Sequence, residues 1–125
     1  MAQALTGHGC FQKYLWSRGR AHSTACCHCP SEVDDAEHTL FICMFWNLER
    51  RDLVLSLGRH PRPEDVADLL CCPAVDELPT DVERRAGIIR AADNQRELFV
   101  RMVEDIIGRK EDLERDRQKE ERRAI

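Results

Sequence analysis

Residues 26–43 read CCHCPSEVDDAEHTLFIC and contain four of the seven cysteines of the chain. Within it, Cys26, Cys29, His38 and Cys43 follow the spacing C-x2-C-x8-H-x4-C. Two thiols separated by two residues can bind one metal ion from a tight turn, and the later His and Cys can complete a tetrahedron. Zn²⁺ prefers four sulfur and nitrogen ligands at about 2.0–2.3 Å. We therefore predict one structural zinc ion per chain, because protein ligands fill all four positions and leave none for substrate or water.

Two alternatives apply to the same stretch. Cys27 and His28 lie inside the first turn and can substitute for the assigned ligands, although adjacent ligands strain the turn through which Cys26 and Cys29 converge. The cysteines can also be buried thiols beside a core histidine, since free cysteine is among the most buried residue types.

The composition favours one mostly α-helical domain. The chain has 125 residues, of which 42% are hydrophobic, 34% charged and only 6% aromatic. Most aromatic residues precede residue 47, so we expect the packed part to be N-terminal and the C-terminal part to be charge-rich. The predicted fold is a small zinc-stabilised helical domain, the CCHC knuckle, followed by a long amphipathic C-terminal helix.

Three segments are expected along the chain. Residues 1–58 form the knuckle domain with its flanking helices, residues 59–80 a proline-containing linker and short helix, and residues 81–125 the long helix with a charged, fraying end. Gly19 and Gly58 are predicted to end the two helices of the first segment. His8, between two glycines, is interpreted as a turn residue, with contact to phosphate or metal as the alternative.

The spacing of the apolar residues predicts one apolar face on each expected helix. In the short helix over residues 10–18, Phe11, Tyr14 and Leu15 share one side, and Trp16 is free to cover the knuckle. The helix over residues 44–58 is expected to bury an apolar face. Its predicted members are Phe45, Trp46, Leu48, Leu53 and Leu57, with Asp52 alongside.

The same spacing predicts two helices in the second half of the chain, one short and one long. Val66, Leu69 and Leu70 give the short helix one apolar face, and the pair Cys71-Cys72 that ends it is interpreted as buried thiols. Thr80 or Asp81 is a plausible N-cap for the long helix. Its apolar stripe is predicted to contain Ile88, Ala92, Phe99, Val103, Ile106, Lys110 and Leu113, widened by Ile89, Met102 and Ile107.

The charge is distributed unevenly. The net charge is −4, but residues 1–31 contain no Asp or Glu and hold Lys13, Arg18 and Arg20. We predict that these cations contact RNA or DNA phosphate and that Tyr14 or Trp16 stacks on a base. The alternative is that these aromatic residues build the core. Arg50 and Arg51 could also meet phosphate, but neighbouring Glu49 and Asp52 offset their field.

The cysteine count and the N-terminus favour an intracellular protein, in the nucleus or the cytoplasm. Seven cysteines are present, and four metal ligands leave Cys10, Cys27, Cys71 and Cys72. We see neither a secretory signal nor a run of transmembrane length, so a reducing compartment is expected. The acid-free N-terminus also superficially fits a mitochondrial transit peptide.

A family resemblance rests on the order of several motifs. These are Leu5-Thr6-Gly7-His8-Gly9, then Phe11, Tyr14-Leu15, Arg18 and Gly19-Arg20, then Cys26-x2-Cys29, and Asp35-Ala36-Glu37-His38-Thr39-Leu40-Phe41-x-Cys43. This order resembles the segment after the polymerase domain in pol polyproteins of non-LTR retrotransposons of the insect type-1 kind. The similarity is dense over residues 5–58 and returns near 98–117, whereas residues 73–97 depart from it.

The resemblance implies a parent protein that is a reverse transcriptase with an endonuclease. Its tail would help bind template RNA or target DNA during target-primed reverse transcription, and the rest of that polyprotein would be a partner. The chain itself shows no phosphate-cradling glycine loop and no carboxylate cluster for two metal ions. We therefore expect it to be no enzyme by itself, and to have neither a membrane nor a small-molecule substrate as partner.

Two other functions compete with nucleic-acid binding. The chain can be a protein-interaction module, in which zinc holds the N-terminal helices together and the long helix docks on a polymerase body or another copy. It can also be a decayed fragment with no present function. Salt separates the first two, because phosphate binding weakens steeply as salt is added.

Overall fold

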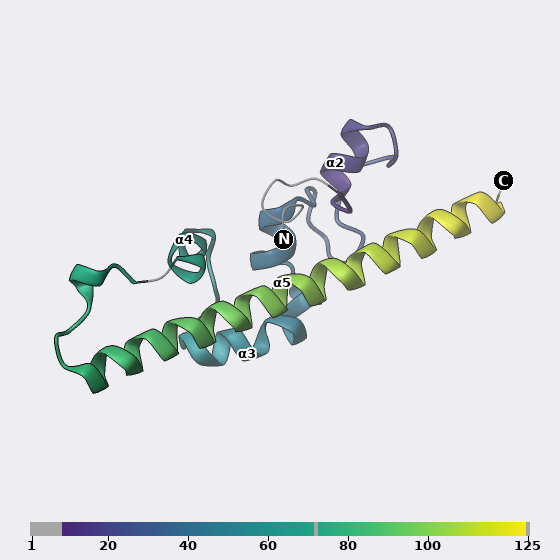
Figure 1. The fold of residues 1–125 in the computed structure, drawn as a ribbon. Helices are drawn as coiled ribbons and strands as arrows, with labels where there is room; N and C mark the ends of the chain where they lie inside the picture. The colour runs from purple at the N-terminus through teal and green to yellow at the C-terminus, as the bar shows by residue number, and fades with distance from the viewer. Residues whose placement is uncertain (1–8, 72, 125) are drawn as a thin grey trace.

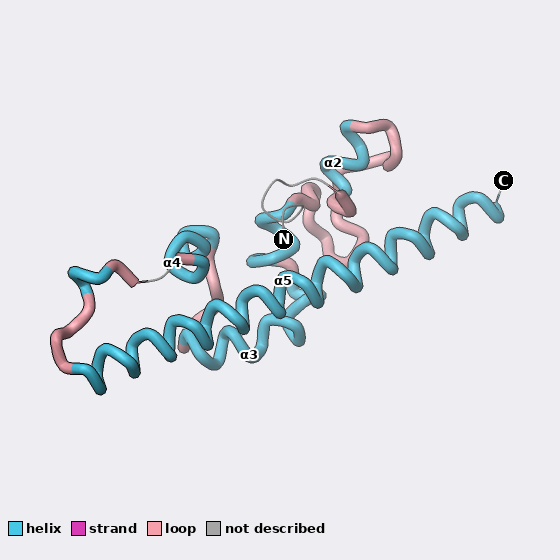
Figure 2. Tube along the Cα trace, viewed as in Figure 1, coloured by secondary structure: helices cyan, strands magenta, loops and turns pink. Residues whose placement is uncertain are grey.

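The computed structural model describes residues 9–71 and 73–124, and the predictions on His8 and Cys72 lie outside them. Figure 1 shows the arrangement of the helices, and Figure 2 shows helices joined by loops, with no strand in the part of the chain described. In order they are α2 (Gln12–Ser17), the π-helix η1 (His38–Ile42), the 3₁₀ turn η2 (Met44–Trp46), α3 (Asn47–Leu57), η3 (Pro63–Asp65), α4 (Val66–Leu70), η4 (Val75–Glu77) and α5 (Val82–Ala124). The prediction of a mostly helical fold that ends in a long helix is confirmed.

Helix α5 is the axis on which the other elements pack. Its 43 residues span about 65 Å at 1.5 Å per residue. Helix α3 packs along its middle, and α4 and η1 also contact it (Figure 1). The residues of α5 that become buried are those at this middle: Phe99, Met102, Val103, Ile106 and Lys110.

One core joins the N-terminal segment to this helix. Trp46 and Leu53 pack with Phe99 and Ile106, and the same cluster contains Cys26 and Cys43 of the knuckle. The two segments therefore share one core.

The buried face of the helix predicted over residues 44–58, which comprises η2 and α3, differs from the prediction. Trp46 and Leu53 are buried as expected, but Leu48 is 70% exposed and Phe45 42% exposed. Arg50, which the sequence suggested as a phosphate contact, is 1% exposed and lies in the interior. The reason is that its guanidinium group finds carbonyl partners there, as described below.

The predicted helix ends are largely as observed. Gly19 and Gly58 have φ values of 70° and 74°, the left-handed conformation that glycine adopts without a steric penalty at a helix C-terminus. Asp81, and not Thr80, caps α5, because its Oδ2 accepts the N–H of Arg84 at 3.0 Å. In the linker, both Arg59 amino groups donate to the Asp65 carboxylate at 2.7 Å.

Two further expectations about burial are wrong. Cys71, at the C-terminal end of α4, is exposed. Trp16 is 54% exposed and does not cover the knuckle. Ile88 and Ile89, which belong to the predicted stripe of α5, are exposed. Over the described residues, no helix combines the length and the apolar character needed to cross a membrane.

Candidate metal centre

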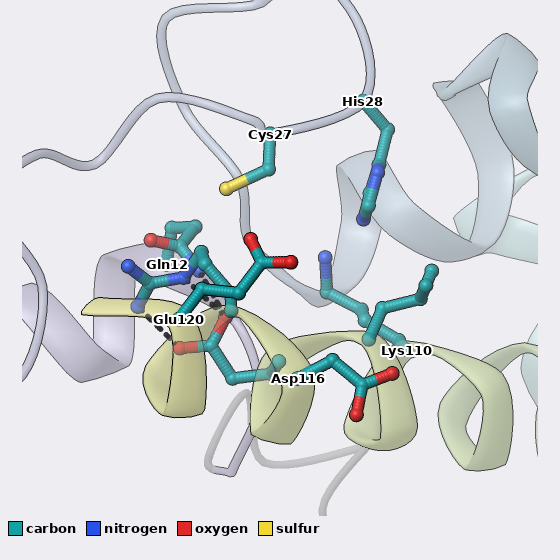
Figure 3. Close-up of a pocket in the computed structure, with 9 residues that line it drawn as sticks. Gln12, Cys27, His28, Lys110, Asp116 and Glu120 are labelled. Carbon is teal, nitrogen blue, oxygen red and sulfur yellow. Dashed lines mark hydrogen bonds and ion pairs between the residues drawn. The ribbon is translucent and has the colours of Figure 1, made fainter. Parts of the chain in front are cut away.

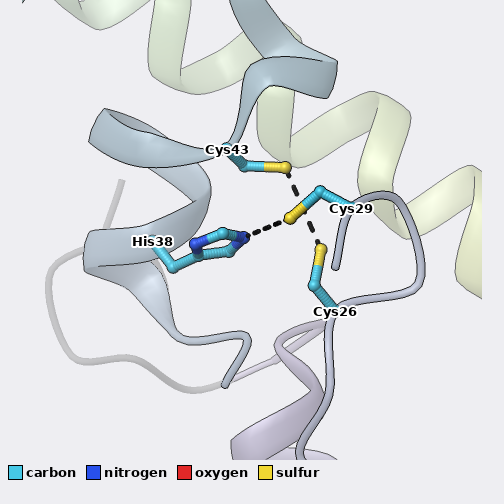
Figure 4. A group of neighbouring side chains, drawn as sticks. All are labelled: Cys26, Cys29, His38 and Cys43. Carbon is cyan, nitrogen blue, oxygen red and sulfur yellow. Dashed lines mark hydrogen bonds between the residues drawn. The ribbon is translucent and has the colours of Figure 1, made fainter. Parts of the chain in front are cut away.

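Four side chains converge at the start of the packed segment. The Sγ atoms of Cys26, Cys29 and Cys43 and a ring nitrogen of His38 all lie within 4.8 Å of one another (Figure 4). The Cys26 and Cys43 sulfurs are 3.9 Å apart, and the Cys29 sulfur is 3.3 Å from His38 Nε2. A tetrahedral ion with metal–sulfur distances of about 2.3 Å separates its sulfurs by about 3.8 Å. The four residues therefore fit one tetrahedral metal ion with only small adjustment.

The π-helix η1 explains how His38 and Cys43 can meet. On an α-helix, residues five apart point roughly 140° away from each other. Here the Cys43 N–H donates to the His38 carbonyl at 2.7 Å, the i→i+5 bond of a π turn. This wider turn brings both side chains toward one side, and Cys43 then leaves the helix in extended conformation.

Backbone donors support the sulfur atoms. The His28 N–H donates to Cys26 Sγ at 3.4 Å, the Ser31 backbone N–H donates to Cys29, and the Phe45 N–H to Cys43. Each donor is two residues after the cysteine that it serves. Such bonds stabilise negative charge on sulfur, which is the form in which a thiol binds metal.

Burial sets the protonation of the metal-free site. It raises the pKa of Cys26 to about 12 and also raises the pKa of Cys43. Burial acts in the same direction on Cys29, but hydrogen bonds from Ser31 and the other two thiols outweigh it and lower its pKa. For His38, burial lowers the pKa and so favours the neutral imidazole that a metal requires. A metal ion that enters must displace thiol protons.

Arg50 places a positive charge next to this site. Its Nε donates to the Leu40 carbonyl at 2.7 Å and its Nη2 to the Thr39 carbonyl at 2.8 Å, so it caps the end of η1. Burial lowers the pKa of Arg50, and the charge of Cys43 opposes that effect. A divalent ion bound by three thiolates and one imidazole has one net negative charge, which this guanidinium offsets.

A buried ion pair ties the knuckle to α5. Lys110 Nζ lies 2.8 Å from Asp34 Oδ2, and the two side chains are 3% and 0% exposed. Asp34 also accepts the Gln12 backbone N–H at 3.0 Å and the Thr39 hydroxyl at 2.7 Å. One carboxylate thus connects α2, η1 and α5.

The structure separates the two alternative ligands from the site. Cys27 points toward a cavity of about 490 Å³ between the turn and α5, lined also by Gln12, Lys110 and Arg117 (Figure 3). The His28 ring stacks on Phe45 with centroids 4.3 Å apart. Neither belongs to the group of converging ligand atoms.

The predicted nucleic-acid contacts gather on and just after α2. Lys13, Trp16, Arg18 and Arg20 are exposed, and Tyr14 is half-buried. The Arg18 guanidinium lies 5.5 Å from the centre of the Tyr14 ring. Trp16 is therefore the more open of the two aromatic side chains.

The buried polar roles of three residues were not predicted from the sequence. Asp34 was not singled out, Arg50 was considered as a phosphate contact, and Lys110 was placed in an apolar stripe. The available signal was Lys110, because a lysine inside an apolar stripe needs a buried acidic partner.

Comparison with protein-family models, curated proteins and solved structures finds no match to this chain.

Proposed function

We propose that the metal is zinc and that it has a structural role. Three sulfur ligands and one imidazole are a donor set typical of structural zinc, and protein atoms fill all four positions. The ligands come from a turn and from the two ends of η1, both of which contact the core around α5. The ion would fasten the turn to η1 and thereby complete the surface on which α5 packs.

We further propose that the chain binds RNA or DNA through α2 and the residues that follow it. The observation that carries this proposal is the clustering of three exposed cations with an exposed tryptophan in a segment without acidic residues. Lys13, Arg18 and Arg20 would contact phosphates, and Trp16 would stack on a base. The buried Arg50 takes no part in such a surface.

The resemblance gives this activity a context. We propose that the chain acts as the tail of a reverse transcriptase of a non-LTR retrotransposon, where it helps hold template RNA or target DNA during target-primed reverse transcription. Such a role is exercised inside the cell, in the nucleus or the cytoplasm.

The test is a titration with single-stranded RNA and double-stranded DNA at several salt concentrations. Three phosphate contacts give a slope of about −2 to −3 in log K against log salt. The double variant Arg18→Ala/Arg20→Ala should reduce that slope by about two thirds. Arg84→Ala/Arg85→Ala, which removes two exposed cations at the start of α5, is the matched control and should leave it unchanged. Equal slopes in both variants would contradict the assignment.

A second function, protein interaction through α5, is favoured by a separate observation. Val82, Ile88 and Ile89 are 78%, 43% and 38% exposed along the first turns of this helix. An apolar partner seated there would bind with little dependence on salt, unlike a nucleic acid.

A further inference from the structure

Two segments far apart in the sequence line one open cavity near the C-terminal end of α5. Helix α2 lies beside this part of α5, where Gln12 Nε2 donates to Glu114 Oε2 at 3.0 Å (Figure 1). The turn after α2 then borders a cavity of about 360 Å³. The lining residues come from both segments, and they are Arg20, Gln118, Glu121 and Arg122. The cavity therefore connects the proposed nucleic-acid surface to the last turns of α5.

The charges around this cavity favour an anion. Arg20 and Arg122 are both exposed, and among the described residues neither guanidinium group binds a carboxylate. The acidic lining residue, Glu121, already has a partner, because its Oε1 accepts from Arg117 Nη1. The cavity thus brings together two arginines without an acidic partner and one carboxylate whose charge is offset.

Arg122 differs in this respect from the arginines that precede it on α5. Arg109, Arg115 and Arg117 each bind a carboxylate, on Glu49, Asp112 and Glu114 respectively. Such pairs use the guanidinium donors that an external anion would need. The donors of Arg122 are not used in this way in the folded chain.

The donors at the cavity match the chemistry of a phosphate group. A guanidinium group presents parallel N–H donors that bind two phosphate oxygens at once, and arginine is for this reason common in phosphate sites. Gln118 adds a neutral donor, because its Nε2 gives one hydrogen to Glu114 Oε1 at 3.2 Å and has a second.

We propose that Arg20 and Arg122 together bind one backbone phosphate of a nucleic acid, which passes between the turn after α2 and the last turns of α5. The inference rests on the proposed nucleic-acid binding and adds α5 to its surface. Residues 101–125 contain equal numbers of acidic and basic residues, so their composition alone assigns no such role to this helix.

The test measures the affinity of the metal-loaded full chain for single-stranded RNA and for double-stranded DNA by fluorescence anisotropy. At about 0.1 M salt, charges more than about 10 Å from the nucleic acid are largely screened. Arg122→Ala should weaken binding roughly tenfold, because it removes a charge-assisted hydrogen bond. Arg123→Ala removes the next arginine of the same helix, which is also exposed but does not line the cavity, and is the matched control. It should bind like the wild type.

A double-mutant cycle tests whether the two arginines share one phosphate. If they do, removing either one leaves the other with a poorly held ligand, so the losses in Arg20→Ala and Arg122→Ala are coupled. The double variant should bind at most about threefold more weakly than the weaker single variant. Losses that multiply would show two separate contacts and overturn the shared site.

The outcomes separate this inference from the function on which it rests. A wild type that binds neither nucleic acid would overturn the proposed function and the shared phosphate site together. If the wild type binds and Arg18→Ala/Arg20→Ala weakens that binding, but Arg122→Ala behaves like Arg123→Ala, the α2 surface stands and the contribution of α5 is wrong.

Discussion

The middle of α5 and its first turns have similar apolar spacing but very different surroundings. Around Val103 and Ile106, the helix is covered by α3 and by the knuckle, and its lysine reaches the buried Asp34. Around Ile88, the same stripe faces outward. Helical periodicity therefore identifies a face that can be buried, whereas the residues that cover this face are distant in the sequence.

The largest effect is expected where a buried charge loses its partner. Lys110→Met should destabilise the chain by about 3–5 kcal/mol, because the Asp34 carboxylate stays buried without its cation. Urea unfolding with metal present measures this. Lys119→Met, an exposed position on the same helix, is the control. A Lys110→Met variant as stable as the control would show that the ion pair does not fasten the knuckle to α5.

The next largest effect is expected from one of two alanine substitutions that compare the middle of α5 with its first turns. Ile106 is fully buried, and Ile106→Ala should cost about 2–5 kcal/mol through lost contacts and a cavity. Ile88→Ala should change the unfolding free energy by no more than about 0.5 kcal/mol. Both are measured by urea unfolding at equal metal loading. Similar losses at the two positions would mean that the first turns are covered in solution.

A smaller effect isolates one hydrogen bond of the buried network. Thr39→Val keeps the shape of the side chain but removes the hydroxyl that donates to Asp34 at 2.7 Å. A bond to a charged group contributes about 1.5–3 kcal/mol, so unfolding should require correspondingly less urea. Thr80→Val, an exposed position, serves as the reference. If the two variants have the same free energy of unfolding, the hydrogen bond from Thr39 to Asp34 does not help to connect these elements.

The smallest effect on stability is expected from a substitution in the first turns of α5. A Cβ built on Gly87 meets no atom within 4 Å, so Gly87→Ala should stabilise the helix by up to about 1 kcal/mol through propensity alone. Thermal unfolding measured by circular dichroism would report the change as a raised midpoint. A lowered midpoint would reveal a close neighbour at this face.

Local patterns in the sequence predicted the features that depend on neighbours along the chain. The ligand set Cys26, Cys29, His38 and Cys43 follows from spacing, and Gly58 marks the end of α3 because a left-handed residue is needed there. The long C-terminal helix follows in the same way from its periodicity and from the lack of proline after Pro79.

Features that depend on distant partners could not be predicted. The burial of Arg50 requires carbonyls that only the π turn presents, and the burial of Asp34 requires Lys110 from the far end of the chain. The predicted orientation of α3 was wrong for a related reason. A buried arginine changes which side of the helix packs inward, so Leu48 turns outward in its place.

The most direct test of the account is the amount of zinc bound per chain, measured by native mass spectrometry with circular dichroism alongside. We predict one equivalent in the wild type and in Cys27→Ala, whose thiol lies outside the cluster. We predict its loss in Cys26→Ala and in His38→Ala, together with helical signal, because metal binding of this kind is coupled to folding. A wild type that is folded without zinc, or a His38→Ala variant that retains zinc and helix, would contradict the account.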